Sequence, residues 1–285
     1  MTGKLFRLQF MDTWRTAGPF SLLGSLIVLI ILPLAWLLGL DFFKSLSVAI
    51  SFLLITLTAG YGFIMTIYND YQNMQGKRAY FVRAIPVSDD TLFRSRFMTY
   101  LAGFLLVLIK FILDLLLIFF LMWILQAEPM SELGRHLAYM RVVMFKPLSL
   151  FMIFLAFLYL IYYVFVFMAS ISIGSESRWQ RFGIGGPILV FALFFIFLQM
   201  VGIVSILFIP LSIKLPPGPI RPAALNLHFV NESMWSKLFE TGSYSEAAMI
   251  SDPILGIGFV PVLIFFTALA AFLTYRSMSK KLSLS

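Results

Sequence analysis

Six long runs of apolar residues, separated by short polar segments, dominate the sequence. The runs cover about 20–40, 46–68, 98–125, 147–173, 187–213 and 253–274. Each can cross a bilayer as a helix, which needs about 20 residues and satisfies its own backbone hydrogen bonds in hydrocarbon. The ten-residue alternation typical of membrane β-barrels is absent. The pattern predicts an all-α membrane protein, with six transmembrane helices forming a single domain over residues 1–285.

The segment before the first run has its own helical pattern. Phe6, Phe10 and Trp14 recur at every fourth position, and Arg7 and Arg15 lie on the adjoining stripe. An amphipathic helix with aromatic and basic stripes is typical of the membrane interface. We therefore expect residues 4–15 to form an interfacial helix, and the first apolar run to be a retained span, because it is too long for a signal peptide.

The polar segment between the second and third runs is the one that looks suited to a soluble partner. Gly76 breaks the chain, aromatic and basic residues alternate over 77–85, and Pro86 ends that stretch because a proline disfavours helix in the residue before it. Ser88 then has the character of an N-cap, with acidic residues in the first turn of the next helix. The third membrane helix should therefore begin near Ser88.

Composition agrees with a membrane protein. The chain is 61% hydrophobic and 12% charged, with a mean hydropathy of +0.96, whereas about a quarter of an ordinary globular chain is charged. Six spans place both termini on one side, which carries 13 of the 21 Lys and Arg residues, against seven on the other side. The positive-inside bias predicts cytoplasmic termini, and the basic residues beside the membrane suit anionic lipid headgroups better than nucleic acid.

Two charges interrupt the third run. Lys110 and Asp114 lie one helical turn apart near its middle, where charged side chains must face protein or water. They can neutralise each other as a packed pair, or they can line a substrate path or a subunit interface. The longest outer segment, 214–252, begins with a proline-rich stretch that cannot be regular helix, and we expect an extracellular loop there.

The sequence lacks the residues that several kinds of catalysis and metal binding need. The sequence has no cysteine, no phosphate-binding loop and only two histidines, so we expect no metal site, no bound cofactor and no catalysis by this chain. Asn69-Asp70-Tyr-Gln-Asn73 approaches the acidic motif of membrane prenyltransferases. One carboxylate is too few for the Mg²⁺ ions of such enzymes. A prenyltransferase-type enzyme and an ATPase-independent scaffold or channel remain as alternatives.

The six spans, the amphipathic amino-terminal helix and the Ala84-Ile-Pro-Val-Ser88 turn before the third span resemble the membrane subunit of ABC-2-type exporters. The likeness covers the whole chain in topology and about 20 residues in motif. It is most similar to the short permeases of Gram-positive peptide exporters, such as those for phenol-soluble modulins or lantibiotic resistance, although lipid and polysaccharide exporters share the architecture.

The resemblance implies a function and a set of residues. Residues 71–86 would be the coupling segment that docks on the ATPase, and 4–15 the connecting helix. The implied ATPase contacts are Arg78, Tyr80, Phe81, Val82, Arg83 and Pro86. The chain would be a non-catalytic permease in a bacterial cell membrane, exporting an amphipathic or hydrophobic substrate such as a peptide. Two cytosolic ATPases would bind ATP and Mg²⁺, and the permease would pair with itself or with a related permease.

Overall fold

A computed structural model describes residues 2–76, 78–84, 87–126, 130–214, 228–236 and 254–280; of Phe81, Arg83, Met130, Ser177, Gln180 and Lys280 it describes only the backbone. About 86% of the described residues are helical, which confirms a predominantly α-helical chain. The helices are α1 (Thr2–Leu37), α2 (Asp41–Met74), α3 (Ala79–Ala84), α4 (Asp89–Leu125), α5 (Met130–Met144), α6 (Pro147–Gly174), α7 (Ser177–Gln180), α8 (Gly185–Phe208) and α11 (Phe259–Lys280).

Six of these helices are long and apolar enough to cross a membrane, counting only the described residues: α1, α2, α4, α6, α8 and α11. This confirms the transmembrane character that the apolar runs predicted. The expected interfacial helix 4–15 and the expected span 20–40 are parts of one continuous helix, α1, even though Pro19 and Pro33 lie inside it. Neither proline ends α1, as is common in membrane helices.

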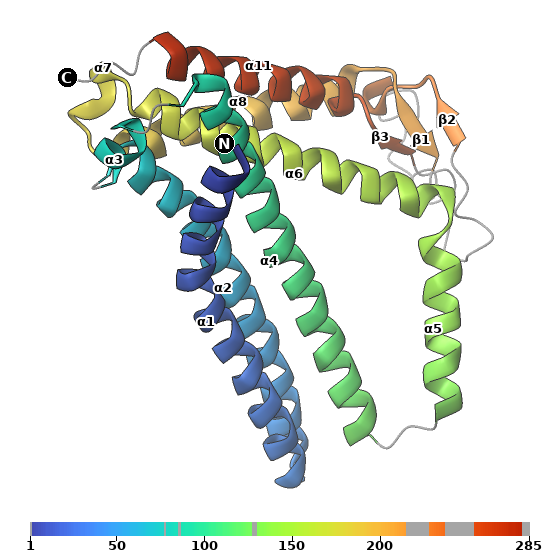
Figure 1. Ribbon diagram of the computed structural model, residues 1–285. Coiled ribbons are helices and arrows are strands. Elements are labelled where there is room, and N and C mark those ends of the chain that lie inside the picture. The colour runs from blue at the N-terminus through green and yellow to red at the C-terminus, as the bar shows by residue number, and fades with distance from the viewer. Residues whose placement is uncertain are drawn as a thin grey trace. The chain divides into compact units, whose positions relative to one another are not determined.

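The chain divides into two compact units, whereas the sequence suggested one domain. The first unit holds α1 to α4, residues 175–177 and the end of α11 from Tyr275 onward. Within it α1, α2 and α4 pack against one another along their lengths (Figure 1), and we call them the three-helix group. Its apolar core is formed by Val28 and Leu32 of α1, Ile55 of α2 and Ile118 of α4.

Glycines let these three helices approach closely. A methyl group at Gly24 of α1 would lie 2.4 Å from Thr58 Cγ2 of α2, and one at Gly62 of α2 would lie 2.7 Å from Val107 Cγ2 of α4. Without a strong hydrophobic driving force between helices in lipid, membrane helices associate through such small-residue contacts.

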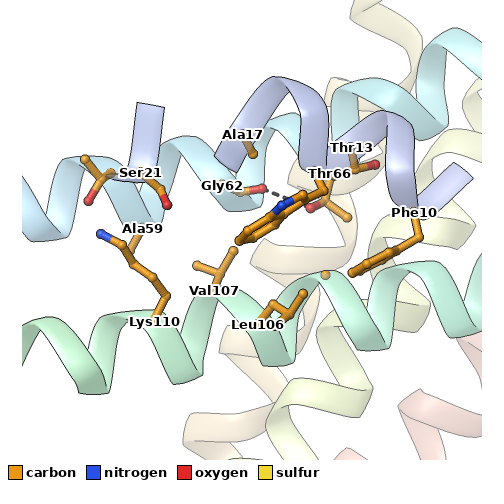
Figure 2. A pocket seen from close by; sticks show the side chains of 13 residues that line it. Phe10, Thr13, Ala17, Ser21, Ala59, Gly62, Thr66, Leu106, Val107 and Lys110 are labelled. Atoms are coloured by element: carbon orange, nitrogen blue, oxygen red, sulfur yellow. Dashed lines mark hydrogen bonds between the residues drawn. The ribbon is translucent and has the colours of Figure 1, made fainter. Parts of the chain in front are cut away.

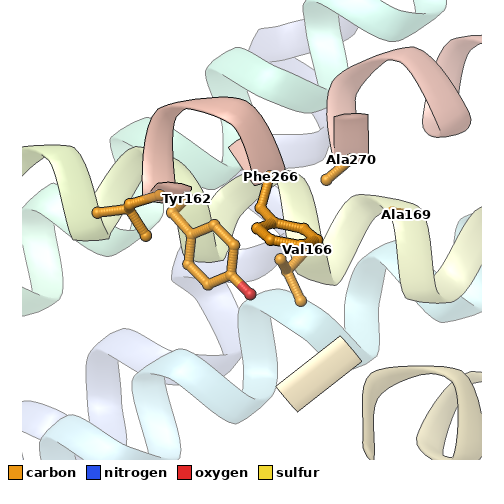
Figure 3. Packing of buried hydrophobic residues seen from close by; sticks show 6 residues of the cluster. Tyr162, Val166, Ala169, Phe266 and Ala270 are labelled. Carbon is orange, nitrogen blue, oxygen red and sulfur yellow. The ribbon is translucent and has the colours of Figure 1, made fainter. Parts of the chain in front are cut away.

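The second unit holds α5, α6, α8, three short strands and α11 up to Thr274. Tyr162, Val166 and Ala169 of α6 pack against Phe266 and Ala270 of α11 in its core (Figure 3). The α6–α8 turn is equally tight. A methyl group at Gly174 would lie 2.4 Å from the backbone nitrogen of Pro187.

The strands form a small antiparallel sheet in the order β2-β1-β3. β1 (Ser212–Lys214) is central, with Ile213 opposite Phe229 of β2 (His228–Val230) and opposite Leu255 of β3 (Ile254–Gly256). Three-residue strands are too short to show an alternating pattern, so nothing in the sequence indicated them. Residues 215–227 and 237–253, most of the expected extracellular loop, lie outside the described residues.

Candidate functional site

The segment between α2 and α4 contains one short helix, α3. α2 ends at Met74, and the N–H groups of Gln75 and Gly76 both donate to the carbonyl oxygen of Tyr71, at 2.8 and 3.0 Å. This confirms the predicted break at Gly76. α3 follows as a helix of six residues, and α4 then begins at Asp89.

The start of α4 confirms the predicted cap. Ser88 has extended backbone angles, and its hydroxyl oxygen accepts a hydrogen bond from the N–H of Thr91 at 3.4 Å. Asp89 and Asp90 occupy the first turn, where the positive end of the helix dipole favours carboxylates. The start of the third membrane-length helix is therefore fixed within one residue of the prediction.

The expected coupling residues are distributed along and beside α3. Tyr80 is 75% exposed, so most of its surface can contact another molecule, whereas Val82 is half-buried. Phe81 and Arg83 belong to α3, but their side chains are not described, and Pro86 lies outside the described residues. Their expected contact with an ATPase stays a prediction.

Arg78 ties this segment to the beginning of α1. Its guanidinium forms an ion pair with Asp12, and the two side chains are 51% and 32% exposed. An ion pair this exposed contributes little stability, about 0–1 kcal/mol. The contact does show that the two expected ATPase-facing elements, α3 and the first turns of α1, lie next to each other.

The aromatic stripe of α1 has the expected helical spacing. The rings of Phe6 and Phe10 stack with centroids 5.5 Å apart, and Trp14 packs over Gly18 while remaining 43% exposed. These contacts lie within α1 and are the ones a connecting helix needs if it is to lie in a membrane interface.

A buried polar cluster lies where α1, α2 and α4 meet near α3. At its centre the guanidinium of Arg96 donates to both carboxylate oxygens of Asp70, at 2.8 and 2.6 Å. The hydroxyl of Tyr100 donates to Asp70 Oδ2 at 3.0 Å. Arg96 and Tyr100 are each 1% exposed and Asp70 is 8% exposed. Both charged groups have lost their hydration on burial, so each depends on its hydrogen bonds to the other for compensation.

Amide and hydroxyl groups surround this ion pair. Thr99 donates to Gln9 Oε1 at 3.2 Å, whereas Gln9 Nε2 is buried with no hydrogen-bond partner among the described residues. Asn69 donates to Thr16 at 3.4 Å. The cluster encloses a cavity of about 10 Å³, close to the smallest space that holds one water molecule. Its walls are Gln9, Thr13, Thr66, Asn69, Asp70, Asn73, Arg96, Thr99 and Tyr100.

This geometry gives the Asn69-Asp70-Tyr-Gln-Asn73 motif a structural explanation. Both oxygens of Asp70 are engaged by Arg96 and Tyr100, whereas an Mg²⁺ ligand must offer a free carboxylate oxygen. Within the described residues no group of three or more His, Cys, Asp or Glu side chains is placed to hold a metal ion.

Sequence analysis missed the partners of Asp70. Arg96 was counted only as a basic residue beside the membrane, and Tyr100 was treated as part of an apolar span. A signal was nevertheless present, because Asn69 and Asn73 recur one turn apart on α2, as do Arg96 and Tyr100 on α4. Polar residues at helical spacing on two neighbouring membrane helices indicate facing polar surfaces.

The second buried ion pair of the three-helix group lies further from α3. Lys110 and Asp114 form an ion pair on α4, and Ser25 of α1 donates to Asp114 Oδ1 at 2.8 Å. Their side chains are 18% and 6% exposed. Lys110 lies at one end of a cavity of about 30 Å³, and Phe10 lies at the other end (Figure 2). The pair therefore packs inside the three-helix group, and its expected place on a substrate path stays a prediction.

Two threonines connect the two polar regions. Thr13 of α1 and Thr66 of α2 line the cavity beside Lys110 (Figure 2), and they also line the cavity beside Arg96. Polar side chains thus run along the inside of the three-helix group for several turns. Beyond Asp114 the interior becomes apolar at Val28, Leu32, Ile55 and Ile118.

Comparison with protein-family models, with curated proteins and with solved structures found no match for this chain. What the chain does must therefore be inferred from its sequence pattern and its geometry.

Proposed function

We propose that this chain is the transmembrane subunit of an ATP-driven exporter of the ABC-2 type. It would move an amphipathic or hydrophobic substrate, foremost a peptide, out of the cell, and a separate ATPase would supply the energy. The single observation that carries the proposal is α3, a short helix between two membrane-length helices that presents an exposed aromatic side chain, Tyr80.

The surroundings of α3 suit a part that receives force. The Arg78–Asp12 ion pair links it to α1, and the Asp70–Arg96 pair joins α2 to α4 just inside the segment that contains α3. A partner that moved α3 would therefore move three long helices together. Movement of this kind is a rigid-body transition driven by a ligand that binds one state better than the other, here ATP on the partner subunit.

The proposed function implies a side of the membrane for α3 and the termini, and a set of partner subunits. The excess of Lys and Arg beside α3 and the termini supports a cytoplasmic location for them. Two ATPase subunits would bind α3 and the start of α1 in two permeases, either two copies of this chain or this chain with a related one. ATP and Mg²⁺ would be held by the ATPases.

The two alternative functions have less support. A prenyltransferase-type enzyme would need Asp70 for metal binding, but Asp70 is committed to Arg96 and Tyr100. An ATPase-independent scaffold or channel would give no reason for a short helix with an exposed tyrosine on the side of the chain that is richer in Lys and Arg. Lys110 and Asp114 would line a path only if the three-helix group opened during transport.

Co-purification with the ATPase tests the proposal. We expect the full-length chain, extracted from its native membrane, to bring with it a soluble ATPase that has a phosphate-binding loop, and we expect the complex to hydrolyse ATP. The purified chain alone should not. Tyr80→Ala, and separately the double substitution Phe81→Ala and Arg83→Ala, should release the ATPase without unfolding the chain.

A matched control is available on α5. Tyr139 is 50% exposed, so Tyr139→Ala removes a comparable aromatic ring elsewhere and should leave the complex intact. Retention of the ATPase by both α3 variants, or ATP hydrolysis by the chain alone, would refute the proposal.

A further inference from the structure

An open groove of about 750 Å³ runs along the first turns of α1 and reaches α3. Four basic residues line it, and the one acidic residue, Asp12, is already paired with Arg78. The basic residues are Lys4, Arg7, Arg15 and Arg78. We call this the basic groove. It carries a net positive charge, and its volume lies within the range of about 300–1,000 Å³ typical of small-molecule sites.

The spacing of charges along the sequence sets the depth of the basic groove relative to a bilayer. Arg15 is the last charged residue before 25 uncharged residues, and the next charge is Asp41. As helix, 25 residues span about 37 Å, which exceeds the hydrocarbon thickness of about 30 Å. Arg15 therefore lies at a membrane surface, and the basic groove begins there at the level of the lipid headgroups and continues along α1 away from the bilayer.

The lining is amphipathic as well as basic. Leu8 and Met11 line the same groove and are 68% and 41% exposed. Because they lie on the aqueous side of Arg15 along α1, these side chains can contact the carbon atoms of a lipid headgroup, while the acyl chains remain in the bilayer. Arginine is suited to the phosphate, because its planar guanidinium donates two parallel hydrogen bonds to it.

We propose that the basic groove binds the headgroup of an anionic phospholipid whose acyl chains stay in the bilayer, with the phosphate held by Arg15 and Arg7. The net positive charge selects an anionic headgroup over a zwitterionic one. This inference rests on the groove and on its depth in the membrane, and it holds whether or not an ATPase binds α3.

Lipid retention by the full-length chain in detergent tests the site. The protein is incubated with phosphatidylglycerol or with phosphatidylcholine of the same acyl chains, and bound lipid is counted by native mass spectrometry. We expect retention of phosphatidylglycerol well above that of phosphatidylcholine. Each guanidinium in direct contact with the phosphate contributes at least about fivefold to binding, so the double variant R7Q/R15Q should bind at least about 30-fold more weakly.

The control removes the same charge elsewhere. Arg178 and Arg181 are exposed and lie outside the groove, so R178Q/R181Q should bind phosphatidylglycerol within about twofold of the wild type. Monodispersity on size exclusion and the helical circular dichroism signal check that each variant is folded. If R7Q/R15Q is not folded, the single variant R15Q, with an expected fivefold loss, replaces it.

Three results would overturn the proposal. Equal retention of both lipids would show that the groove does not distinguish an anionic headgroup from a zwitterionic one. An equal loss of phosphatidylglycerol binding in R7Q/R15Q and R178Q/R181Q would show that binding depends on the overall charge of the protein and not on the groove. Displacement of the lipid by free glycerol 3-phosphate at the same concentration would show a site for soluble phosphate esters instead.

Discussion

The substitution Arg96→Met removes one partner of the buried Asp70–Arg96 ion pair while keeping a long side chain at position 96. The pair is deeply enclosed, with the Arg96 side chain at 0% and the Asp70 side chain at 8% exposure. In the variant, Asp70 would keep the hydrogen bond from Tyr100 but lose two charged donors. An ionised carboxylate would then lie buried with a single neutral donor.

The expected loss follows from the cost of an uncompensated buried charge. Breaking a buried pair by removing one partner destabilises a protein by about 3–5 kcal/mol, whereas replacing both partners with neutral groups is often nearly neutral. We therefore expect R96M alone to lose about 3–5 kcal/mol. The double variant D70N/R96M should lose at least about 2 kcal/mol less than R96M, because Asp70→Asn removes the buried charge and leaves an amide oxygen that can still accept from Tyr100.

Unfolding of the purified chain in detergent micelles by increasing SDS, followed by tryptophan fluorescence, measures these changes. Arg94 provides the control on the same helix. Its side chain is 66% exposed and pairs with an exposed Asp90, so R94M should change the free energy of unfolding by no more than about 1 kcal/mol.

Two results would refute this reasoning. If R96M and R94M unfold at the same SDS concentration, the buried pair contributes no more stability than the exposed pair. If D70N/R96M is destabilised by the sum of its single variants, the two residues are energetically independent and the pair is not a unit.

Three other predictions concern helix packing and helix ends. Gly174→Ala places a methyl group 2.4 Å from the backbone of α8 and should lower stability by about 1–3 kcal/mol in the SDS unfolding assay. Gly202→Ala, with nothing within 4 Å, should be neutral or stabilising in the same assay. Ser88→Ala should cost about 1 kcal/mol, and hydrogen exchange should show faster opening of the first turn of α4. Lys110→Met should lower the SDS unfolding midpoint, and adding Asp114→Asn should restore part of the loss; no recovery would contradict a paired role.

The membrane-spanning elements of this fold could be predicted because their cause is local. A run of about 20 apolar residues has one stable form in hydrocarbon, and the Ser88 cap and the Gly76 break are properties of a few neighbouring residues. The pairing of Lys110 with Asp114 belongs to the same class, because i and i+4 positions meet on any helix.

Other elements depend on contacts that the sequence does not display. Arg96 lies 26 residues from Asp70, and the polar spacing on α2 and α4 indicates facing surfaces without identifying which residues pair. The sheet around Ile213 joins three-residue strands from distant parts of the chain. α5 is shorter and more polar than the six membrane-length helices, and no helix was predicted there. These features arise from packing between elements and became visible only with the structure.

The Asp70–Arg96 contact has a consequence for how this protein can change over evolutionary time. It joins α2 and α4 one turn before α2 ends and two turns after α4 begins. Since the two helices are held together there, residues 75–87 between them are not needed to keep them adjacent. Insertions, deletions and new surface residues in 75–87 can accumulate without disturbing the helices, so this segment can adapt to a different binding surface while the membrane part stays the same.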